Sequence, residues 1–303
     1  MKMTKPEHRE TERNTAGNAN ELKTPLLSAY ARKFLIRGFR YAFIIAGAAI
    51  VLFPIYLMIT TSLKPRIDAF AIPPEWLFVP TFESYVIVLL EENFLRYFAN
   101  SITVAIGATV GSVLMAAAAA YGIVRFNARG TGAFLALTLI LKMIPEVILL
   151  VPVFLLWNSL GLINTRIGLI LVYVALNLAF NIWIIRAFMM DIPRELEQSA
   201  EIDGCSEFTI FTRIMLPLVA PGMSVAAIFT FRLAWNEFIL GLALTDRLTR
   251  TLPVAVSNYI TDVGVQWGPI TAIATLIAVP AFLFTFFSAR SLISGLTAGA
   301  VKG

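Results

Sequence analysis

Ionisable and amide side chains interrupt stretches of the sequence that are otherwise apolar. Lys142 and Glu146 lie four residues apart in one hydrophobic stretch, and a second stretch contains Arg232, Asn236 and Glu237. On a helix, residues four apart share a face, so Lys142 and Glu146 can pair with each other. A charged group at membrane depth costs roughly 2.5 to 3.5 kcal/mol on insertion scales, which makes a functional role the first hypothesis. These groups predict either the polar lining of a pathway between helices or hydrogen bonds that hold helices together, and both interpretations stay open.

Two asparagines, Asn177 and Asn181, lie four apart in a third hydrophobic stretch, and packing and lining are equally compatible with them. Catalysis is not indicated, because no pair of carboxylates and no nucleophile beside a base stands out. The single cysteine, Cys205, excludes an internal disulfide, and the single histidine, His8, predicts no histidine-based metal site. Neither GxxxxGK[ST] nor HExxH occurs, so the sequence contains no recognisable phosphate-binding loop and no zinc-protease motif.

The composition is that of an integral membrane protein. Hydrophobic residues make up 58% of the 303 residues and charged residues only 14%, with a mean hydropathy of +0.78. Soluble domains contain about a quarter charged residues. The net charge of +5 would suggest a nucleic-acid partner in a soluble protein. Here the distribution of the charge along the chain indicates membrane orientation instead, and no nucleic-acid partner is predicted.

The hydrophobic stretches predict an all-α protein with six transmembrane helices. A helix rises about 1.5 Å per residue, so about 20 apolar residues cross a hydrocarbon layer of about 30 Å. The predicted spans cover about 41–63, 97–124, 132–157, 167–185, 219–243 and 270–288. Pro54 is expected to kink the first span without ending it. The second span is rich in Gly and Ala, which permits close packing against other helices.

Lys and Arg are unequally distributed between the two sides that six spans define. The segments on the side of both termini contain sixteen of these residues, and the segments on the opposite side contain six. Since positive residues concentrate on the cytoplasmic side, both termini and the polar loop 191–218 are predicted to be cytoplasmic. Segments 64–96 and 244–268 are then external. Residues 1–31 are polar and charge-rich, which predicts a disordered cytoplasmic tail.

The polar loop 191–218 has the sequence signals of two short helices. Asp191 is a suitable helix cap, and Pro193 is tolerated in a first helical turn. Gly204 follows a run of acidic residues and offers a left-handed turn between the helices. A second helix is predicted to begin near Ser206 and to end at Pro217. Two short helices between two spans form a projection into water that is suited to contact another protein.

This loop resembles the cytoplasmic loop of the permease subunits of binding-protein-dependent ABC importers. The family pattern is Glu-Ala-Ala, three residues, Gly, nine residues and then Ile-x-Leu-Pro. Here nine residues separate Gly204 from Ile214, which begins the same Ile-x-Leu-Pro ending. In the family the loop docks on a cytoplasmic ATPase subunit. The corresponding docking residues here are Glu197, Gln198, Ser199, Ala200, Asp203, Gly204, Ile214, Leu216 and Pro217.

Two positions depart from the family pattern, because Gln198 replaces its Glu and Ser199 replaces its first Ala. Two other segments resemble the carbohydrate-type members of the family. One is the Trp-Asn-Glu-Phe stretch at 235–238, and the other is the C-terminal stretch 295–303. The resemblance covers residues from about 60 to 303.

The resemblance implies the type I ABC importer permease fold in a bacterial plasma (inner) membrane. The first helix and an external segment, 32–94, would precede a five-helix core domain, 95–288, and a cytoplasmic tail, 289–303. The implied partners are a second permease subunit, two ATPase subunits and an extracytoplasmic solute-binding protein. The implied solute is a carbohydrate or a related polyol or glycoside. ATP and Mg²⁺ would bind the ATPase partners, so this chain is expected to bind no cofactor and to catalyse no reaction itself.

A stand-alone secondary transporter driven by ions or protons is the chief alternative. Such a transporter would need no ATPase, and its activity would disappear with the ion gradient. No internal repeat is obvious between the first three spans and the last three, which disfavours this alternative. A membrane-embedded enzyme would need polar catalytic groups clustered at one depth, and only Arg232, Asn236 and Glu237 come close to that.

Overall fold

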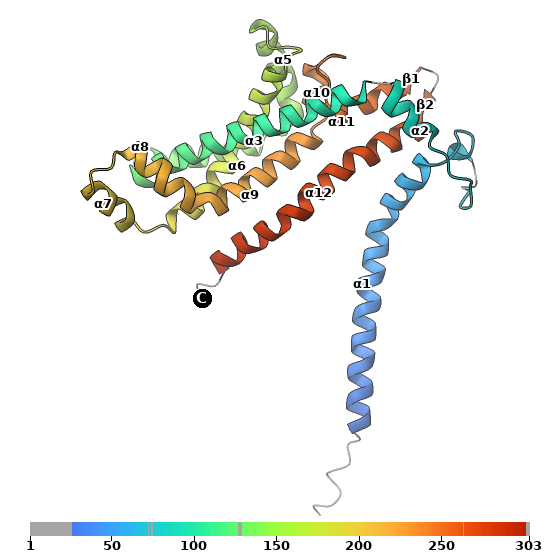
Figure 1. The fold of residues 1–303 in the computed structure, drawn as a ribbon, viewed down its shortest axis with the longest axis horizontal. Coiled ribbons are helices and arrows are strands. Elements are labelled where there is room, and N and C mark those ends of the chain that lie inside the picture. The colour runs from blue at the N-terminus through green and yellow to red at the C-terminus, as the bar shows by residue number, and fades with distance from the viewer. Residues whose placement is uncertain are drawn as a thin grey trace, which may run out of the picture. The chain divides into compact units, whose positions relative to one another are not determined.

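The computed structural model describes residues 26–300 apart from 72, 74, 92, 127, 128 and 263. The described part consists almost entirely of helices, as predicted, together with one hairpin of two-residue strands (Figure 1). It divides into two compact units, with the boundary between Leu57 and Met58.

The first unit contains most of helix α1 (Leu26–Ser62). Its side chains from Lys33 to Leu57 are exposed and mostly apolar, which suits a helix that is surrounded by lipid. Pro54 lies within α1 and the helix continues beyond it, as predicted. Residues 1–25 of the predicted disordered tail, 1–31, lie outside the described residues. Residues 26–31 belong to α1, so the prediction of disorder is wrong for them.

Four long helices form the centre of the second unit. Helix α3 (Phe94–Arg125) packs against α6 (Arg166–Met190) and α9 (Leu216–Asn236), and α9 also packs against α12 (Trp267–Ala300). Glycines permit the closest of these approaches: a Cβ atom on Gly107 would lie 2.7 Å from Ile170 Cδ1. The Gly- and Ala-rich second span therefore packs closely, as predicted.

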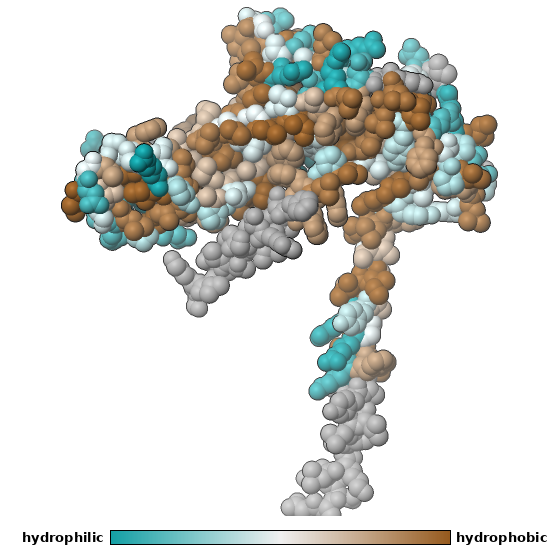
Figure 2. Space-filling view, viewed as in Figure 1, coloured by the Kyte–Doolittle hydropathy of each residue, from teal (hydrophilic) through white to brown (hydrophobic). Residues whose placement is uncertain are grey.

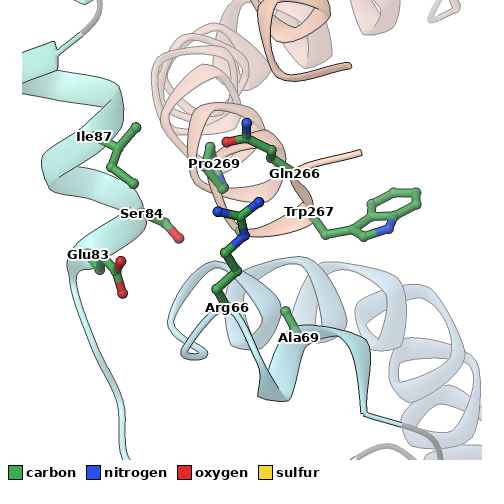
Figure 3. A pocket seen from close by; sticks show the side chains of 9 residues that line it. Arg66, Ala69, Glu83, Ser84, Ile87, Gln266, Trp267 and Pro269 are labelled. Carbon is green, nitrogen blue, oxygen red and sulfur yellow. The ribbon is translucent and has the colours of Figure 1, made fainter. Parts of the chain in front are cut away.

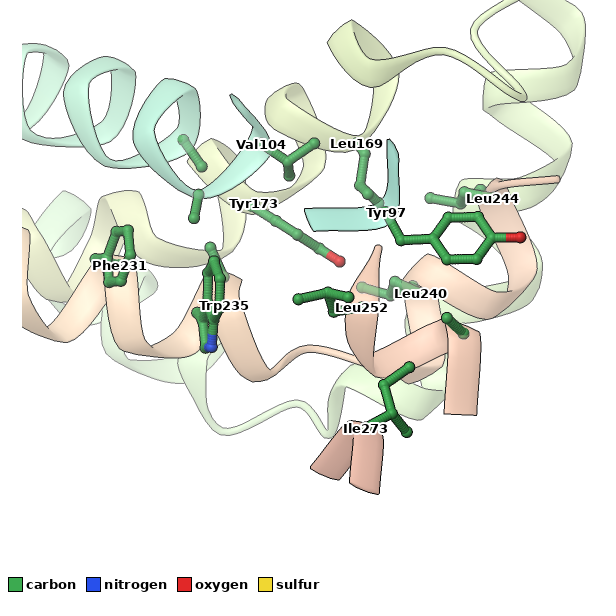
Figure 4. Packing of buried hydrophobic residues seen from close by; sticks show 14 of the residues in the cluster. Tyr97, Val104, Leu169, Tyr173, Phe231, Trp235, Leu240, Leu244, Leu252 and Ile273 are labelled. Atoms are coloured by element: carbon green, nitrogen blue, oxygen red, sulfur yellow. The ribbon is translucent and has the colours of Figure 1, made fainter. Parts of the chain in front are cut away.

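Two buried clusters stabilise this helix group. One contains Tyr97, Tyr173 and Trp235, packed with residues of the segment that follows α9 (Figure 4). The other lies towards the loop after α6 and includes Ala116, Ile185 and Met215 together with residues of that loop. Apolar side chains also cover the outer flanks of the helices, and hydrophilic ones gather towards the ends of the helix group (Figure 2). This is the pattern of helices that contact lipid on their outer sides.

The third predicted span, 132–157, is not one continuous helix. Helix α4 (Thr131–Lys142) is followed by a 3-10 turn η3 (Glu146–Leu149) and helix α5 (Leu150–Ser159), and the two parts are bent by 94°. Pro145 explains the break, since proline has no N–H group and disfavours a helical residue before it. Among the described residues, five helices are long and apolar enough to cross a membrane, or six if the bent pair counts as one span.

The fifth predicted span also differs from its predicted course. Helix α8 (Glu207–Ile210), a π turn η4 (Phe211–Met215) and α9 form one helical stretch, so Pro217 does not end the second loop helix. The π turn just before the proline widens the helix where the pyrrolidine ring would meet the preceding turn. The stretch ends at Asn236, and a separate helix α10 (Ile239–Leu244) follows, so 219–243 is not a single helix.

Short elements make up the two predicted external segments. The first contains η1 (Asp68–Phe70), α2 (Glu83–Val86) and η2 (Ile87–Glu91). The second contains α11 (Leu252–Ala255), η5 (Val256–Tyr259) and the antiparallel strands β1 (Ile260–Thr261) and β2 (Gly264–Val265). In the second unit, α11 and the hairpin lie at one end of the long helices, and α7 (Glu195–Ile202) and α8 lie at the other (Figure 1).

Candidate functional site

The loop between α6 and α9 folds into the predicted pair of short helices. Helix α7 ends near Asp203, Gly204 turns the chain with a φ of +82°, and α8 follows. The predicted left-handed glycine is therefore confirmed. Ser206 caps α8 by accepting a hydrogen bond from the Thr209 amide at 3.3 Å. Asp191 ends α6 and does not cap α7, which starts after Arg194 without a side-chain cap.

The predicted docking residues divide into an exposed group and a buried or half-buried group. Gln198, Ser199, Asp203, Gly204 and Pro217 are exposed to solvent. Ile214 and Leu216 are half-buried, whereas Glu197 and Ala200 are buried. Four of these exposed residues lie on α7 or at the turn after it, whereas Pro217 is the second residue of α9.

Reciprocal contacts connect α7 to the end of α3, and we call them the α3–α7 clasp (Arg125, Arg194 and Glu197). Arg125 Nε lies 2.5 Å from Glu197 Oε1, and both side chains are only 9% exposed. Arg125 Nη2 also donates to the carbonyl of Ile192 at 3.1 Å. Arg194 Nη2 donates in the opposite direction, to the carbonyl of Val124 at 3.1 Å. Carbonyls at a helix end have no partner within the helix, so an arginine is well suited to bind them.

Glu237 occupies the break between α9 and α10. Its carboxylate accepts hydrogen bonds from the Tyr173 hydroxyl at 2.5 Å, the Leu240 amide at 2.8 Å and the Gly241 amide at 2.9 Å. The residue is buried, with 8% of its surface exposed. It therefore holds α10 against α6 from inside the protein.

The neighbours of Glu237 in the sequence do not share this environment. Arg232 and Asn236 are both exposed, and Asn236 Nδ2 donates to the carbonyl of Arg232 at 2.7 Å within α9. The structure thus brings Arg232 and Asn236 together on one exposed face and separates Glu237 from them.

Asn181 lies where three helices meet. Its Nδ2 atom donates to Ser112 Oγ on α3 and to Thr230 Oγ1 on α9, each at 2.8 Å. Asn177 is also buried, but its Nδ2 donates to the carbonyl of Tyr173 in its own helix at 2.8 Å. The Oδ1 atoms of both asparagines accept no hydrogen bond from the described residues. In this chain the contacts of Asn181 are those of helix packing.

A cleft of about 460 Å³ lies beside the break in the third span. The two charged residues predicted to pair are at its edge, with Lys142 Nζ 3.9 Å from Glu146 Oε1. Lys142 Nζ also donates to the carbonyl of Leu176 on α6 at 3.1 Å. The opposite wall includes Ala175 and Ala179 of α6.

A second pocket, of about 60 Å³, lies between the first external segment and the start of α12 (Figure 3). Its polar lining residues include Arg66, Glu83, Ser84 and Gln266, with Trp267 beside them. It is too small for most organic ligands, which occupy about 300–1,000 Å³. Among the described residues, no group of three His, Cys, Asp or Glu side chains is placed to hold a metal ion.

Several residues of these sites carried no distinctive sequence signal. Arg125, Ser112, Thr230 and Tyr173 lie in ordinary positions of long helices, and their partners are 49 to 72 residues away in the sequence.

Comparisons with known proteins agree on one family. The family model described as "Binding-protein-dependent transport system inner membrane component" matches residues 108–297. The probable ABC transporter permease protein y4oR of Sinorhizobium fredii is 38% identical over 255 residues, covering 84% of this chain and 92% of the relative. The diacetylchitobiose uptake system permease protein DasC of Streptomyces coelicolor is 33% identical, with the same coverage. The trehalose transport system permease protein SugB of Mycobacterium tuberculosis is 34% identical, covering 83% and 93%.

Solved structures agree on the fold. A chain of a bacterial ABC transporter involved in the import of the acidic polysaccharide alginate matches with a TM-score of 0.71 and 21% identity. The match covers 86% of this chain and 97% of the other. A chain of the MetNI methionine ABC transporter matches with a TM-score of 0.52 and 18% identity, covering 66% and 95%. The family model and the relatives together establish that this chain belongs to the family of inner membrane components of binding-protein-dependent transport systems, the permease subunits of ABC transporters.

Proposed function

We propose that this chain is the permease subunit of an ATP-driven importer and forms half of the translocation pathway for a carbohydrate or a related polyol or glycoside. The printed functions of several relatives support the solute class. These relatives are permease proteins for diacetylchitobiose, trehalose and trehalose/maltose.

The single observation that carries the coupling role is the α7–α8 loop. The exposed residues of α7 and of the turn at Gly204 lie at one end of the long helices (Figure 1), and the α3–α7 clasp connects them to the helix group. We propose that this exposed group docks on a cytoplasmic ATPase subunit, which binds ATP and Mg²⁺. In this proposal the buried Glu197 and Ala200 support the docking surface, because they have little surface to offer a partner.

The proposed importer contains a second permease subunit, two ATPase subunits and an extracytoplasmic solute-binding protein. The chain crosses the membrane six times if the bent pair α4–α5 is one span, with both termini in the cytoplasm. The five-helix core, 95–288, then follows the first span and external segment, 32–94, and precedes the tail 289–303.

The proposed pathway residues differ in how they would act. Lys142, Glu146, Arg232 and Asn236 have exposed surface and would line the pathway directly. The buried Glu237, Asn177 and Asn181 would shape the pathway through the helices that they hold.

Gly204 provides the test of the docking role. A Cβ atom at this position meets no atom within 4 Å, so substitution acts only through the positive φ. A β-branched residue is a strained outlier there, and the left-handed conformation costs an L-residue about 1–2 kcal/mol. Gly204→Val should leave the chain in the membrane but reduce the amount of ATPase that copurifies and the uptake of labelled trehalose, maltose or diacetylchitobiose into proteoliposomes. Gly132→Val is the matched control, since its Cβ also meets no atom within 4 Å and its φ is not left-handed.

Normal ATPase binding and normal uptake by Gly204→Val would contradict the docking role. Uptake that needs no ATPase and stops when an ionophore collapses the gradient would support the secondary-transporter alternative instead.

A further inference from the structure

The break between α4 and η3 leaves non-helical backbone inside a segment that is apolar enough to span the membrane. Backbone groups without helical partners are costly in lipid, and such breaks persist only where they are buried in protein or line a water-filled cavity. The cleft of about 460 Å³ adjoins this break and includes Met143, Ile144 and Pro145 in its lining. The break therefore faces a cavity and not only neighbouring side chains.

The cleft lies beside the middle of α6, which is long and apolar enough to cross a membrane. Ala175, Leu176 and Ala179 of its wall are the tenth, eleventh and fourteenth of the 25 residues of α6. At about 1.5 Å per residue, these positions are about 15–20 Å from the start of a helix that is about 37 Å long. A solute that crosses the membrane between permease helices passes this depth.

The polar groups at the cleft have unused hydrogen-bonding capacity. The Lys142 and Glu146 side chains are 35% and 34% exposed and lie 3.9 Å apart. An ammonium has three N–H donors and a carboxylate has about four acceptor sites. Lys142 uses one donor for the Leu176 carbonyl and directs another towards Glu146. Donor and acceptor capacity thus remains side by side at the edge of the cavity.

We propose that this cleft is a solute-binding station in which Lys142 and Glu146 hold two adjacent hydroxyl groups of a neutral sugar. One hydroxyl accepts from the ammonium and the other donates to the carboxylate, while apolar walls such as Leu141 and Leu149 contact the C–H faces of the ring. The volume falls within the range of about 300–1,000 Å³ of small-molecule sites. Because the two charges cancel, the station has no net charge that would favour an anion or a cation, and its paired donors and acceptors suit a neutral polyhydroxyl solute. This inference rests on the proposed function and adds that this subunit contacts the solute itself.

Cysteine accessibility tests the station directly, because the chain has a single cysteine that Cys205→Ser removes. In that background, Ala175→Cys places a thiol at an exposed position of the cleft wall. Leu171→Cys is the control, one turn earlier on α6, exposed but outside the cleft. In the complete complex with its loaded binding protein, the transported sugar of the uptake assay should slow maleimide labelling at position 175 several-fold and leave position 171 unchanged. Equal labelling of Ala175→Cys with and without the sugar would overturn the proposal.

A double variant gives a second readout. Lys142→Met/Glu146→Leu removes both charges together, so neither is left unpaired. We expect uptake to fall at least tenfold and the sugar to lose its protection at Ala175→Cys, while the same amount of ATPase copurifies. Unchanged uptake by the double variant would also overturn the proposal. Failure of the carbohydrate assignment is a different result, since the unmodified complex would then take up none of the three sugars.

Discussion

Asn181 connects three helices through one side-chain amide. It is completely buried, and its hydrogen bonds to Ser112 and Thr230 fix α6 relative to both α3 and α9. Interhelical hydrogen bonds of this kind contribute about 0.6 kcal/mol each on average and up to about 1.7 kcal/mol in membrane proteins. Two of them on one atom specify the register of all three helices.

Replacing this amide should therefore destabilise the protein. Asn181→Leu is expected to lower the free energy of unfolding by about 1–3 kcal/mol, because both interhelical hydrogen bonds are lost. The measurement is unfolding of the purified complex by SDS in mixed micelles. Asn236→Leu is the control, since Asn236 bonds only within its own helix and is exposed. Equal destabilisation by the two substitutions would contradict the packing role of Asn181.

For single residues, the backbone conformation could be predicted from the sequence, whereas the hydrogen-bond partners of the side chains could not. A positive φ was predicted for Gly204 because it follows the acidic residues of α7 and glycine, which has no Cβ atom, adopts this conformation easily. The structure confirms this prediction. The environments of Glu237 and Asn181 depend on Tyr173, Ser112 and Thr230, which lie on other helices. Sequence spacing within one helix contains no information about such neighbours.

Helices α3 and α7 are joined by the α3–α7 clasp, whose central ion pair is buried. Removing one member of a buried pair leaves an unpaired charge and typically costs about 3–5 kcal/mol, whereas replacing both is often nearly neutral. Arg125→Met should therefore reduce both thermal stability and ATPase copurification. The double variant Arg125→Met/Glu197→Leu should recover most of the loss.

The measurement is a double-mutant cycle on the unfolding temperature and on the amount of bound ATPase. Glu201→Gln serves as a control, because Glu201 lies one turn from Glu197 on α7 but is exposed. If the effects of Arg125→Met and Glu197→Leu on stability and on ATPase binding were additive, the two residues would not act as a pair.

Hydropathy predicted the long helices well but missed where they break. The apolar content of 132–157 and 219–243 is continuous, so it indicates one span in each case. The breaks arise from Pro145 and from the capping of α10 by Glu237, and only the proline is visible as a local signal. At Pro217 the sequence predicted a helix end that the structure does not have, because a π turn accommodates the proline within a continuous helical stretch.

The second unit as a whole has two distinct ends. The α7–α8 loop lies at one end of its long helices, and α11 and the hairpin lie at the other (Figure 1). Nine of the 24 Lys and Arg residues precede the first predicted span, and they supply most of the excess on the side predicted to be cytoplasmic. Reporters fused after residue 303 and inserted in the 191–218 loop should both be located in the cytoplasm. A reporter inserted after Asp262 should be external.

Paired cytoplasmic and external reporters, such as green fluorescent protein and alkaline phosphatase, measure these locations. A cytoplasmic location for the insertion after Asp262, or an external one for either of the others, would contradict the six-span arrangement.

The continuous helical stretch from Glu207 to Asn236 has a mechanical consequence. Its 30 residues measure about 45 Å, with the α7–α8 loop at one end and the Glu237 break at the other. No interruption lies between these ends, since Pro217 is absorbed by the π turn and Pro221 lies within α9. A displacement of the end that carries the α7–α8 loop can therefore be transmitted along the stretch to α10 at the far end. The two-residue link at 237–238 is then the point at which the helices can bend. The hydrogen bonds from α10 to the Glu237 carboxylate restrict this bending.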